Sequence, residues 1–249
     1  MNKKAFISGA TSGIGQATAR LFAANNIDLV ICGRRKERLG QLAAELNNVN
    51  IQTLSFDVRN YADVEKAFNA LPEEWRNIDF LINNAGNAHG LDLIQDGNLE
   101  DWDQMIDTNI KGLLYVSKLI IPGMISKKSG HIINIGSIAG KETYSKGNVY
   151  CATKHAVDAL TEGMRIDLIS TGIKVSSINP GMVETEFSKV RFKGDSQKAN
   201  AVYSGVDPLR PEDIADIIYF AITRPAHVNI SDLTVLAAAQ ASAVVVNRQ

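Results

Sequence analysis

The sequence lacks the features that mark several classes of protein. Its 249 residues include only two cysteines, Cys32 and Cys151, which are too few for a disulfide framework and agree with reduced thiols. The 26 Lys and Arg residues nearly balance the 27 Asp and Glu residues, so the basic excess typical of a nucleic-acid-binding domain is absent. No stretch reaches the roughly 18 uninterrupted apolar residues of a membrane-spanning helix, and the first apolar run is too short for a signal peptide. We therefore expect a soluble, cytoplasmic protein without a nucleic-acid or membrane partner.

Short apolar runs and segments of helical period alternate along the chain. The runs have the length and β-branched content of strands buried on both faces, and they cover residues 5–7, 29–32, 51–56, 80–82, 132–135, 175–178 and 233–236. Helical spacing of apolar residues occupies intervals such as 14–25, 35–47 and 60–71, and two longer helices are predicted from Leu99 and from Val149. The alternation predicts an α/β fold with right-handed βαβ units and a parallel sheet.

No linker or internal repeat divides the chain, so residues 1–249 are predicted to form a single domain. Segment 186–207 is polar and weakly periodic, and we expect it to form a substrate lid. The C-terminal stretch 237–249 contains three consecutive valines, which we expect to pack on the body of the domain or on another subunit. No metal site is expected.

The first predicted strand leads into a glycine-rich turn that is followed by a helix. Its glycines have the spacing G-x-x-x-G-x-G, which differs from the G-x-G-x-x-G of the commonest dinucleotide-binding fingerprint. Glycines allow a sharp turn and let backbone N–H groups and the positive end of the helix approach a pyrophosphate. Glycine also collects in turns for local reasons, but a position between a strand and a helix favours phosphate binding. The predicted contacts are Gly9, Thr11, Ser12, Gly13, Ile14 and Gly15.

Two arginines stand where the second predicted strand ends. NAD-binding proteins usually place Asp or Glu there to bind the ribose 2′-hydroxyl, and this chain has Arg34 and Arg35 instead. A guanidinium pairs well with a phosphate, so these residues predict NADP(H) as the cofactor, with Arg34 as the first candidate and Arg35 as the second. The alternative is a solvated basic start of a helix, although basic residues at that end oppose the helix dipole.

Tyr150 and Lys154 lie four residues apart, on one face of the second long helix. A phenol with a pKa near 10 is a poor base at neutral pH, and lowering that pKa by ~3 units takes about 4 kcal/mol. An ammonium group at ~4 Å supplies about that much at an effective dielectric constant of ~20, which would make Tyr150 a workable acid–base group. Alone, however, this pair is common by chance, and a surface tyrosine packed on a lysine stem is then the better interpretation.

The pair does not stand alone, because the sequence resembles the short-chain dehydrogenase/reductase family from the first strand to about Leu236. The motifs occur in the family's order and approximate spacing, and they are the glycine turn, Asn83-Asn84-Ala85-Gly86, Asn109, Ser137, Tyr150 with Lys154, and Pro180-Gly181. One departure is Ser8, where the family usually has Thr, but the hydroxyl is kept. The resemblance implies a Rossmann-type, doubly wound sheet of seven parallel strands with helices on both faces.

The resemblance also implies roles for individual residues. Tyr150 exchanges a proton with the substrate hydroxyl or carbonyl, and Ser137 hydrogen-bonds the same oxygen. Lys154 lowers the pKa of Tyr150 and contacts the nicotinamide ribose, and Tyr150 is itself an expected cofactor contact. Asn109 holds a water that connects Lys154 to solvent. An asparagine in mid-helix fits a local bend with such a use. The other implied cofactor contacts are Asp57, Val58, Asn84, Gly86, Pro180, Gly181, Val183 and Thr185; Asp57 is also suited to cap the helix that follows it.

Within the family, the chain looks most like bacterial NADP-dependent 3-hydroxy acid dehydrogenases, which oxidise serine and L-allo-threonine and reduce malonic semialdehyde. This likeness rests on segments 73–79, 186–195 and 225–230. A 3-hydroxy acid such as 3-hydroxypropionate brings a carboxylate, which needs a cationic partner once it is enclosed. Arg191 and Lys193 in the expected lid are the candidates, and we assign Arg191; alternatively both are solvated or contact another subunit.

Two other functions stay open at this point. A reductase of longer carbonyl substrates, such as a 3-oxoacyl thioester or a sugar, would need an apolar or extended groove at the lid. A non-enzymatic NADP(H) sensor would have a damaged catalytic set, whereas Asn109, Ser137, Tyr150 and Lys154 are all present. Members of the family are often tetramers, and the apolar C-terminal stretch agrees with a homotetramer.

Overall fold

A computed structural model describes residues 2–249, and its centre is one sheet of seven parallel strands in the order β3-β2-β1-β4-β5-β6-β7. The order changes direction between β1 and β4, and this reversal opens a crevice at the carboxyl ends of those two strands. Every predicted strand is confirmed. The strands are β1 (Lys4–Ser8), β2 (Asp28–Gly33), β3 (Ile51–Ser55), β4 (Phe80–Asn83), β5 (Gly130–Ile135), β6 (Ile173–Pro180) and β7 (Asp232–Val235).

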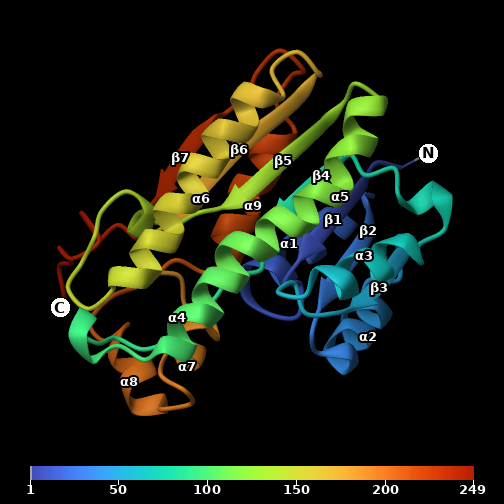
Figure 1. Ribbon diagram of the computed structural model, residues 1–249. Coiled ribbons are helices and arrows are strands. Elements are labelled where there is room, and N and C mark those ends of the chain that lie inside the picture. The colour runs from blue at the N-terminus through green and yellow to red at the C-terminus, as the bar shows by residue number, and fades with distance from the viewer. Residues whose placement is uncertain (1) are drawn as a thin grey trace.

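Helices cover both faces of this sheet, as the sequence predicts. In Figure 1, α4, α5 and α6 lie in front of the sheet, and α1 and α9 lie behind it. The longer helices are α1 (Gly13–Ala24), α2 (Lys36–Glu45), α3 (Tyr61–Asn69), α4 (Leu99–Ile106), α5 (Leu113–Ser126), α6 (Asn148–Asp167) and α9 (Pro211–Ile222). Short 3-10 turns are η1 (Glu73–Trp75), η2 (Ile94–Asp96) and η4 (Ile138–Gly140).

Successive side chains of each central strand point to opposite faces of the sheet and pack into two separate hydrophobic cores. Ile7 and Ile31 point into the core beneath α1, α2 and α9, whereas Phe6 and Val30 point into the core beneath α3, α5 and α6. These side chains are at most 1 % exposed, because a strand in the middle of a doubly wound sheet buries both faces. The two cores hold the sheet rigid, so the loops at its carboxyl edge start from fixed positions.

Three segments near that edge depart from regular structure. The first long helix is interrupted between α4 and α5 by the π-helical turn η3 (Asp107–Gly112), which contains Asn109. The expected lid contains two short helices, α7 (Phe187–Arg191) and α8 (Ser196–Ala201), which lie together at the lower left of Figure 1. The C-terminal stretch turns back on itself, with a bridge between Gln240 and Val246. Within residues 2–249, no helix is long and apolar enough to cross a membrane.

Candidate active site

A cleft of about 650 Å³ runs along the carboxyl edge of the sheet. Its volume lies in the range of pockets that hold small molecules and cofactors. Gly15 and Asn109 are buried behind its wall and do not line it. The other predicted site residues all do, and they are Gly9, Thr11, Ser12, Gly13, Ile14, Arg34, Arg35, Asp57, Val58, Asn84, Gly86, Ser137, Tyr150, Lys154, Pro180, Gly181, Val183, Thr185 and Arg191.

The glycine turn leaves β1 and enters α1 in a conformation that needs its glycines. Gly9 and Gly13 have φ values of +67° and +53°, in the left-handed region that side chains disfavour. A Cβ built on Gly15 would lie 2.5 Å from the Asn84 side-chain nitrogen and 2.6 Å from the Gly9 carbonyl oxygen. The first turn of α1 contains no acidic residue, and the side chain of its N-cap, Ser12, makes no capping hydrogen bond. The positive end of the helix is therefore open to an anion in the cleft.

A second loop, after β4, is tied to the glycine turn by hydrogen bonds. The Ser8 hydroxyl accepts from the backbone N–H groups of Asn84 (3.0 Å) and Ala85 (2.9 Å) and donates to the Ile82 carbonyl. The Asn84 side chain in turn donates to the carbonyls of Ser8 and Gly9. The hydroxyl at position 8 thus connects the loops after β1 and β4, the two strands that flank the crevice.

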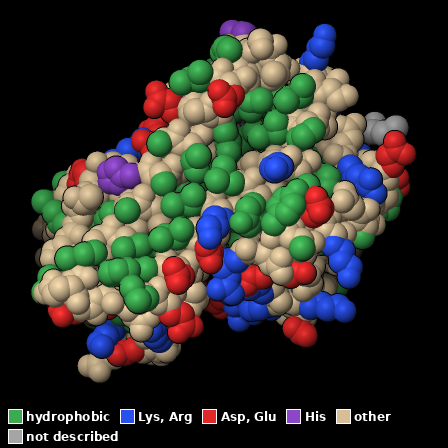
Figure 2. Space-filling model, viewed as in Figure 1, with side chains coloured by type: hydrophobic (Ala, Val, Ile, Leu, Met, Phe, Trp, Pro, Cys, Tyr) green, Lys and Arg blue, Asp and Glu red, His purple; other side chains and the backbone are tan. Residues whose placement is uncertain are grey.

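The exposed end of the cleft is crowded with charge, and Arg34 is its most accessible guanidinium. The Arg34 side chain is 62 % exposed, and its only ion pair among residues 2–249 is a 3.8 Å contact with Asp57. Asp57 itself is held more tightly by Arg59, at 2.7 Å, and Arg59 keeps the pKa of that carboxyl below its usual value although burial opposes the shift. Lys and Arg side chains gather at the lower edge of the molecule, between the regions where Figure 1 labels α7 and α2 (Figure 2). This is the end at which the sequence predicts a 2′-phosphate.

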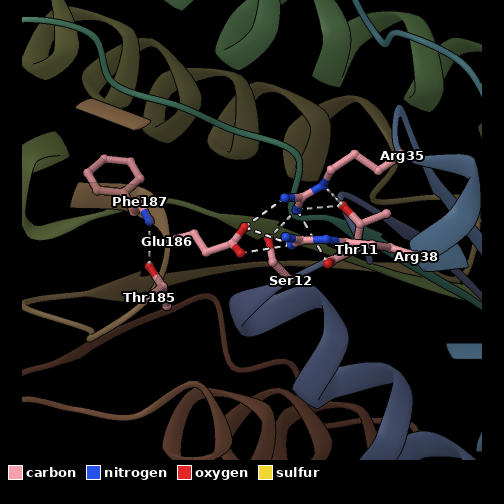
Figure 3. A network of polar contacts seen from close by, with 7 residues as sticks. All are labelled: Thr11, Ser12, Arg35, Arg38, Thr185, Glu186 and Phe187. Atoms are coloured by element: carbon pink, nitrogen blue, oxygen red, sulfur yellow. Dashed lines mark hydrogen bonds and ion pairs between the residues drawn. The ribbon is translucent and has the colours of Figure 1, made fainter. Parts of the chain in front are cut away.

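Arg35 is engaged differently from Arg34. Its guanidinium donates to Thr11 Oγ1 at 2.9 Å and to Ser12 Oγ at 2.8 Å, and it pairs with Glu186 Oε2 at 2.7 Å. Arg38 also reaches Glu186, at 2.8 Å from Oε1. Figure 3 shows both guanidinium groups converging on this one carboxylate, which comes from the segment that leads into α7.

The opposite end of the cleft is buried and contains the predicted catalytic residues. Tyr150 and Lys154 extend from α6 and are 8 % and 7 % exposed, and Ser137 follows β5 as the N-cap of η4. Burial raises the pKa of Tyr150, and nearby Tyr144 adds to the rise, whereas a hydrogen bond to Ser137 and the charge of Arg191 lower it. Burial lowers the pKa of Lys154 to about 8, and its ammonium donates to the Ile135 carbonyl at 2.9 Å. The expected lowering of the Tyr150 pKa by Lys154 stays a prediction.

Asn109 lies directly behind this group, in the π-helical turn. Its side-chain nitrogen donates to the Asn87 carbonyl and to Thr153 Oγ1, and its oxygen accepts from the Asn87 backbone N–H at 2.9 Å. A Cβ built on Gly86 would lie 3.3 Å from that oxygen and 3.6 Å from the Lys154 nitrogen. Asn109 and Lys154 therefore face the same glycine. The local irregularity expected around Asn109 is present as the π turn.

The lid brings one of its two candidate cations to the buried end. Arg191 donates to the Gly90 carbonyl and to the Tyr144 hydroxyl, and its guanidinium carbon lies 5.7 Å from the centre of the Tyr150 ring. Lys193 pairs instead with buried Asp101 at 3.0 Å and does not line the cleft. Arg191 is thus next to the predicted acid–base group, and Lys193 is not.

Several residues in or near the cleft received no site role from the sequence. Arg38 belongs to the basic cluster at positions 34–38, but only Arg34 and Arg35 were assigned to the cofactor. Its position three residues after Arg35 was the signal that could have included it. No sequence pattern indicated a site role for Glu186 or Phe187. The ring of Phe187 lies 5.6 Å from that of Tyr150. The cleft wall from the C-terminal stretch was also missed, and it comprises Gln240, Ala243, Val244, Val246 and Arg248.

Comparison with known proteins places these features in context. The family model described as short chain dehydrogenase matches residues 3–196. The NADP-dependent 3-hydroxy acid dehydrogenase YdfG of Salmonella typhi is 46% identical over 95% of this chain and 96% of its own. Sulfoacetaldehyde reductase 2 of Chromohalobacter salexigens is 44% identical over 100% of both chains.

Solved structures agree with these relatives. The closed form of serine dehydrogenase complexed with NADP+ superposes with a TM-score of 0.93 at 45% identity, covering 99% of this chain and 100% of that one. Serine dehydrogenase from Escherichia coli superposes with a TM-score of 0.83 at 40% identity, covering 96% and 99%.

Proposed function

The chain belongs to the short-chain dehydrogenase family, and on that premise we propose that it is an NADP(H)-dependent oxidoreductase of small 3-hydroxy acids. Serine, L-allo-threonine and 3-hydroxypropionate are the candidate alcohols, and malonic semialdehyde is a candidate carbonyl for the reverse direction. The observation that carries the substrate class is the contact between Arg191 and Tyr150.

The cleft fits NADP(H) in three respects. The turn around Gly9 and Gly13 presents backbone to a pyrophosphate without side chains in the way, and α1 directs its uncapped positive end into the same space. Arg34 is exposed and nearly free to pair with a 2′-phosphate. When bound, the nicotinamide supplies or accepts the hydride. Thr185 and Gly181 also line the cleft, and the family resemblance implies that Thr185 holds the carboxamide.

The chain's own residues supply the proton chemistry. Tyr150 donates a proton to the carbonyl oxygen or removes one from the hydroxyl, and Ser137 hydrogen-bonds the same oxygen and the phenol. Lys154 is held by the Ile135 carbonyl, and its pKa of about 8 lets it exchange protons near neutral pH. Asn109 faces the same glycine as Lys154 and is the residue that would hold a relaying water.

Arg191 sets the length of the substrate. A 3-hydroxy acid has a single carbon between its carboxylate and its hydroxyl-bearing carbon, so the cation that binds it must stand beside the acid–base group. Arg191 does so, and among residues 2–249 its second terminal nitrogen donates to no protein acceptor. The same geometry suits a two-carbon sulfonate aldehyde, and the similarity to a sulfoacetaldehyde reductase favours that as the second candidate.

The test is a panel of initial rates at fixed cofactor concentration. NADP+-linked oxidation of L-serine, L-allo-threonine, 3-hydroxypropionate and 3-hydroxybutyrate is compared with NADPH-linked reduction of sulfoacetaldehyde and of a 3-oxoacyl thioester. We expect the highest kcat/KM with a three- or four-carbon 3-hydroxy acid. A higher value for the thioester would exclude the proposed substrate class, and binding of NADPH without any turnover would indicate a sensor.

We further propose a cytoplasmic homotetramer. Cys32 and Cys151 are both buried and free, which suits a reducing compartment. Hydrophobic side chains spread over the face formed by α4, α5 and α6 (Figure 2), and Leu99, Leu114 and Ile166 on these helices are 70 %, 38 % and 65 % exposed. Light scattering of the purified protein measures the assembly directly, and a monomer would contradict this proposal.

A further inference from the structure

Glu186 connects two parts of the cleft that lie far apart in the sequence. Its carboxylate, at the start of α7, accepts from Arg35 at 2.7 Å and from Arg38 at 2.8 and 3.0 Å. Arg35 and Arg38 belong to the turn and helix after β2, and Arg35 lines the cofactor cleft together with Glu186. The contact therefore joins the expected lid to the charged end of the cleft, as the converging side chains in Figure 3 show.

Arg35 is anchored on the opposite side by the glycine turn. Its Nε and Nη2 groups donate to Thr11 Oγ1, and Nη2 also donates to Ser12 Oγ and the Thr11 carbonyl. Since Nη1 pairs with Glu186, each nitrogen of this guanidinium has a protein partner. Arg35 thus has few N–H donors left for a phosphate, whereas almost all N–H donors of the Arg34 guanidinium remain available.

We propose that Glu186 is a positioning residue, a latch that holds the lid closed over the bound cofactor through Arg35 and Arg38. In this role Arg35 supports the latch and the glycine turn, and Arg34 is left as the guanidinium that reads the 2′-phosphate. The latch rests on the proposed binding of NADP(H), but it does not depend on which alcohol is oxidised.

The latch also reaches the buried end of the cleft through α7. Glu186 is the N-cap of this helix and Arg191 is its last residue, so the two ends of one short helix carry the latch and the proposed substrate cation. Phe187 follows Glu186 and packs on the Tyr150 ring. Closure at Glu186 therefore positions Arg191 and Phe187 against Tyr150, and opening releases all of them together.

The charges predict how strong this contact is. The side chains of Glu186, Arg35 and Arg38 are 40 %, 40 % and 43 % exposed, so solvent and salt screen their attraction. Loss of both ion pairs should therefore have a modest effect and accelerate cofactor dissociation about 5-fold at low salt.

The experiment measures NADPH dissociation by stopped-flow fluorescence, without substrate, in the wild type and in Glu186→Gln, Arg38→Met and the double variant. Glu184→Gln is the matched control, because Glu184 is exposed on the same loop and its side chain makes no hydrogen bond or ion pair within residues 2–249. We expect about 5-fold faster release in Glu186→Gln, little further change in the double variant, and wild-type behaviour in the control. The difference should shrink in 0.5 M salt, roughly as screening requires.

NADH separates the latch from a competing explanation. A latch holds either cofactor, so Glu186→Gln should accelerate NADH release by the same factor as NADPH release. If the carboxylate instead competes with the 2′-phosphate for the arginines, the variant will bind NADPH more tightly and leave NADH unchanged, which overturns the latch. Equal rates in the wild type and Glu186→Gln also overturn it. A wild type that binds neither cofactor overturns the proposed function, whereas tight cofactor binding without 3-hydroxy acid turnover overturns only the substrate class.

Discussion

The two ends of the cleft are built from different interactions. At the catalytic end, Tyr150 and Lys154 are less than a tenth exposed, and burial is the largest influence on the pKa of each. At the charged end, Arg34 is 62 % exposed, and its surroundings are ion pairs in contact with solvent. The first end is fixed by packing and by backbone contacts such as that of Lys154 with Ile135, whereas the second is held by contacts that salt can weaken.

This difference assigns the proton-transfer chemistry to the buried end and the choice of cofactor to the exposed end. A buried, preformed group of donors does not have to reorganise when charge develops on the substrate oxygen. Exposed guanidinium groups attract an anion and distinguish a phosphate from a hydroxyl, but each contributes less because water competes. Variants at the buried end should therefore change rates strongly, and variants at the exposed end should change affinity and its dependence on salt.

The largest effect is expected for Tyr150→Phe at the buried end. The variant keeps the ring that packs on Phe187 and loses the hydroxyl, so kcat should fall by roughly 1,000-fold. NADPH affinity should change by less than about twofold, since the Tyr150 hydroxyl is one of many proposed cofactor contacts along the cleft. Steady-state kinetics and fluorescence titration measure the two quantities. An active variant would remove Tyr150 from the acid–base role.

At the exposed end, Arg34→Ala should weaken NADPH binding by about 30-fold and leave NADH binding nearly unchanged. The reason is the loss of charge-assisted hydrogen bonds to the 2′-phosphate, which NADH lacks. Lys36→Ala is the control, because Lys36 is exposed on the same turn but does not line the cleft. Equal losses for both cofactors would show that Arg34 does not read the phosphate.

Arg191→Met tests the lid residue that reaches the buried end. The KM for 3-hydroxypropionate should rise about 10-fold, while the KM for 1-propanol should change little, because only the acid loses an ionic partner. Lys193→Met should have no comparable effect, since Lys193 pairs with Asp101 outside the cleft. A parallel rise for acid and alcohol would mean that Arg191 supports the lid without binding the carboxylate.

The last prediction is a gain in stability at the buried end. Burial lowers the pKa of Lys154 from its usual 10.5 to about 8, so holding its charge at pH 7 costs about 3 kcal/mol. Lys154→Met removes that cost and forfeits one hydrogen bond of about 1 kcal/mol, so the melting temperature should rise by about 4–8 °C. The penalty on the wild type is fully present below pH 8 and disappears as pH rises toward about 10.5, so the two melting temperatures should converge there. Calorimetry from pH 6.5 to 10 measures this trend, and a lower melting temperature for the variant at pH 7 would contradict it.

The sequence predicted the buried scaffold better than the contacts across the cleft. Short apolar runs were enough to predict the strands, because a parallel strand that is buried on both faces needs an almost continuous apolar sequence. The spacing of Gly9, Gly13 and Gly15 located the turn after the first strand. The ion pair of Glu186 with Arg35 joins positions 151 residues apart, and no local pattern encodes such a contact. The same holds for the Ile135 carbonyl that receives Lys154 and for the C-terminal residues in the cleft wall, which only the folded chain brings together.

The most direct measurement follows the hydride itself. The purified protein is incubated with NADP+ and 3-hydroxypropionate deuterated at C3, and the reduced cofactor is analysed by mass spectrometry and NMR. We predict one deuterium at C4 of the nicotinamide in the wild type and almost no reduced cofactor in Tyr150→Phe. Reduced cofactor without deuterium, or no reduction by the wild type, would contradict hydride transfer between a 3-hydroxy acid and NADP+ at this site.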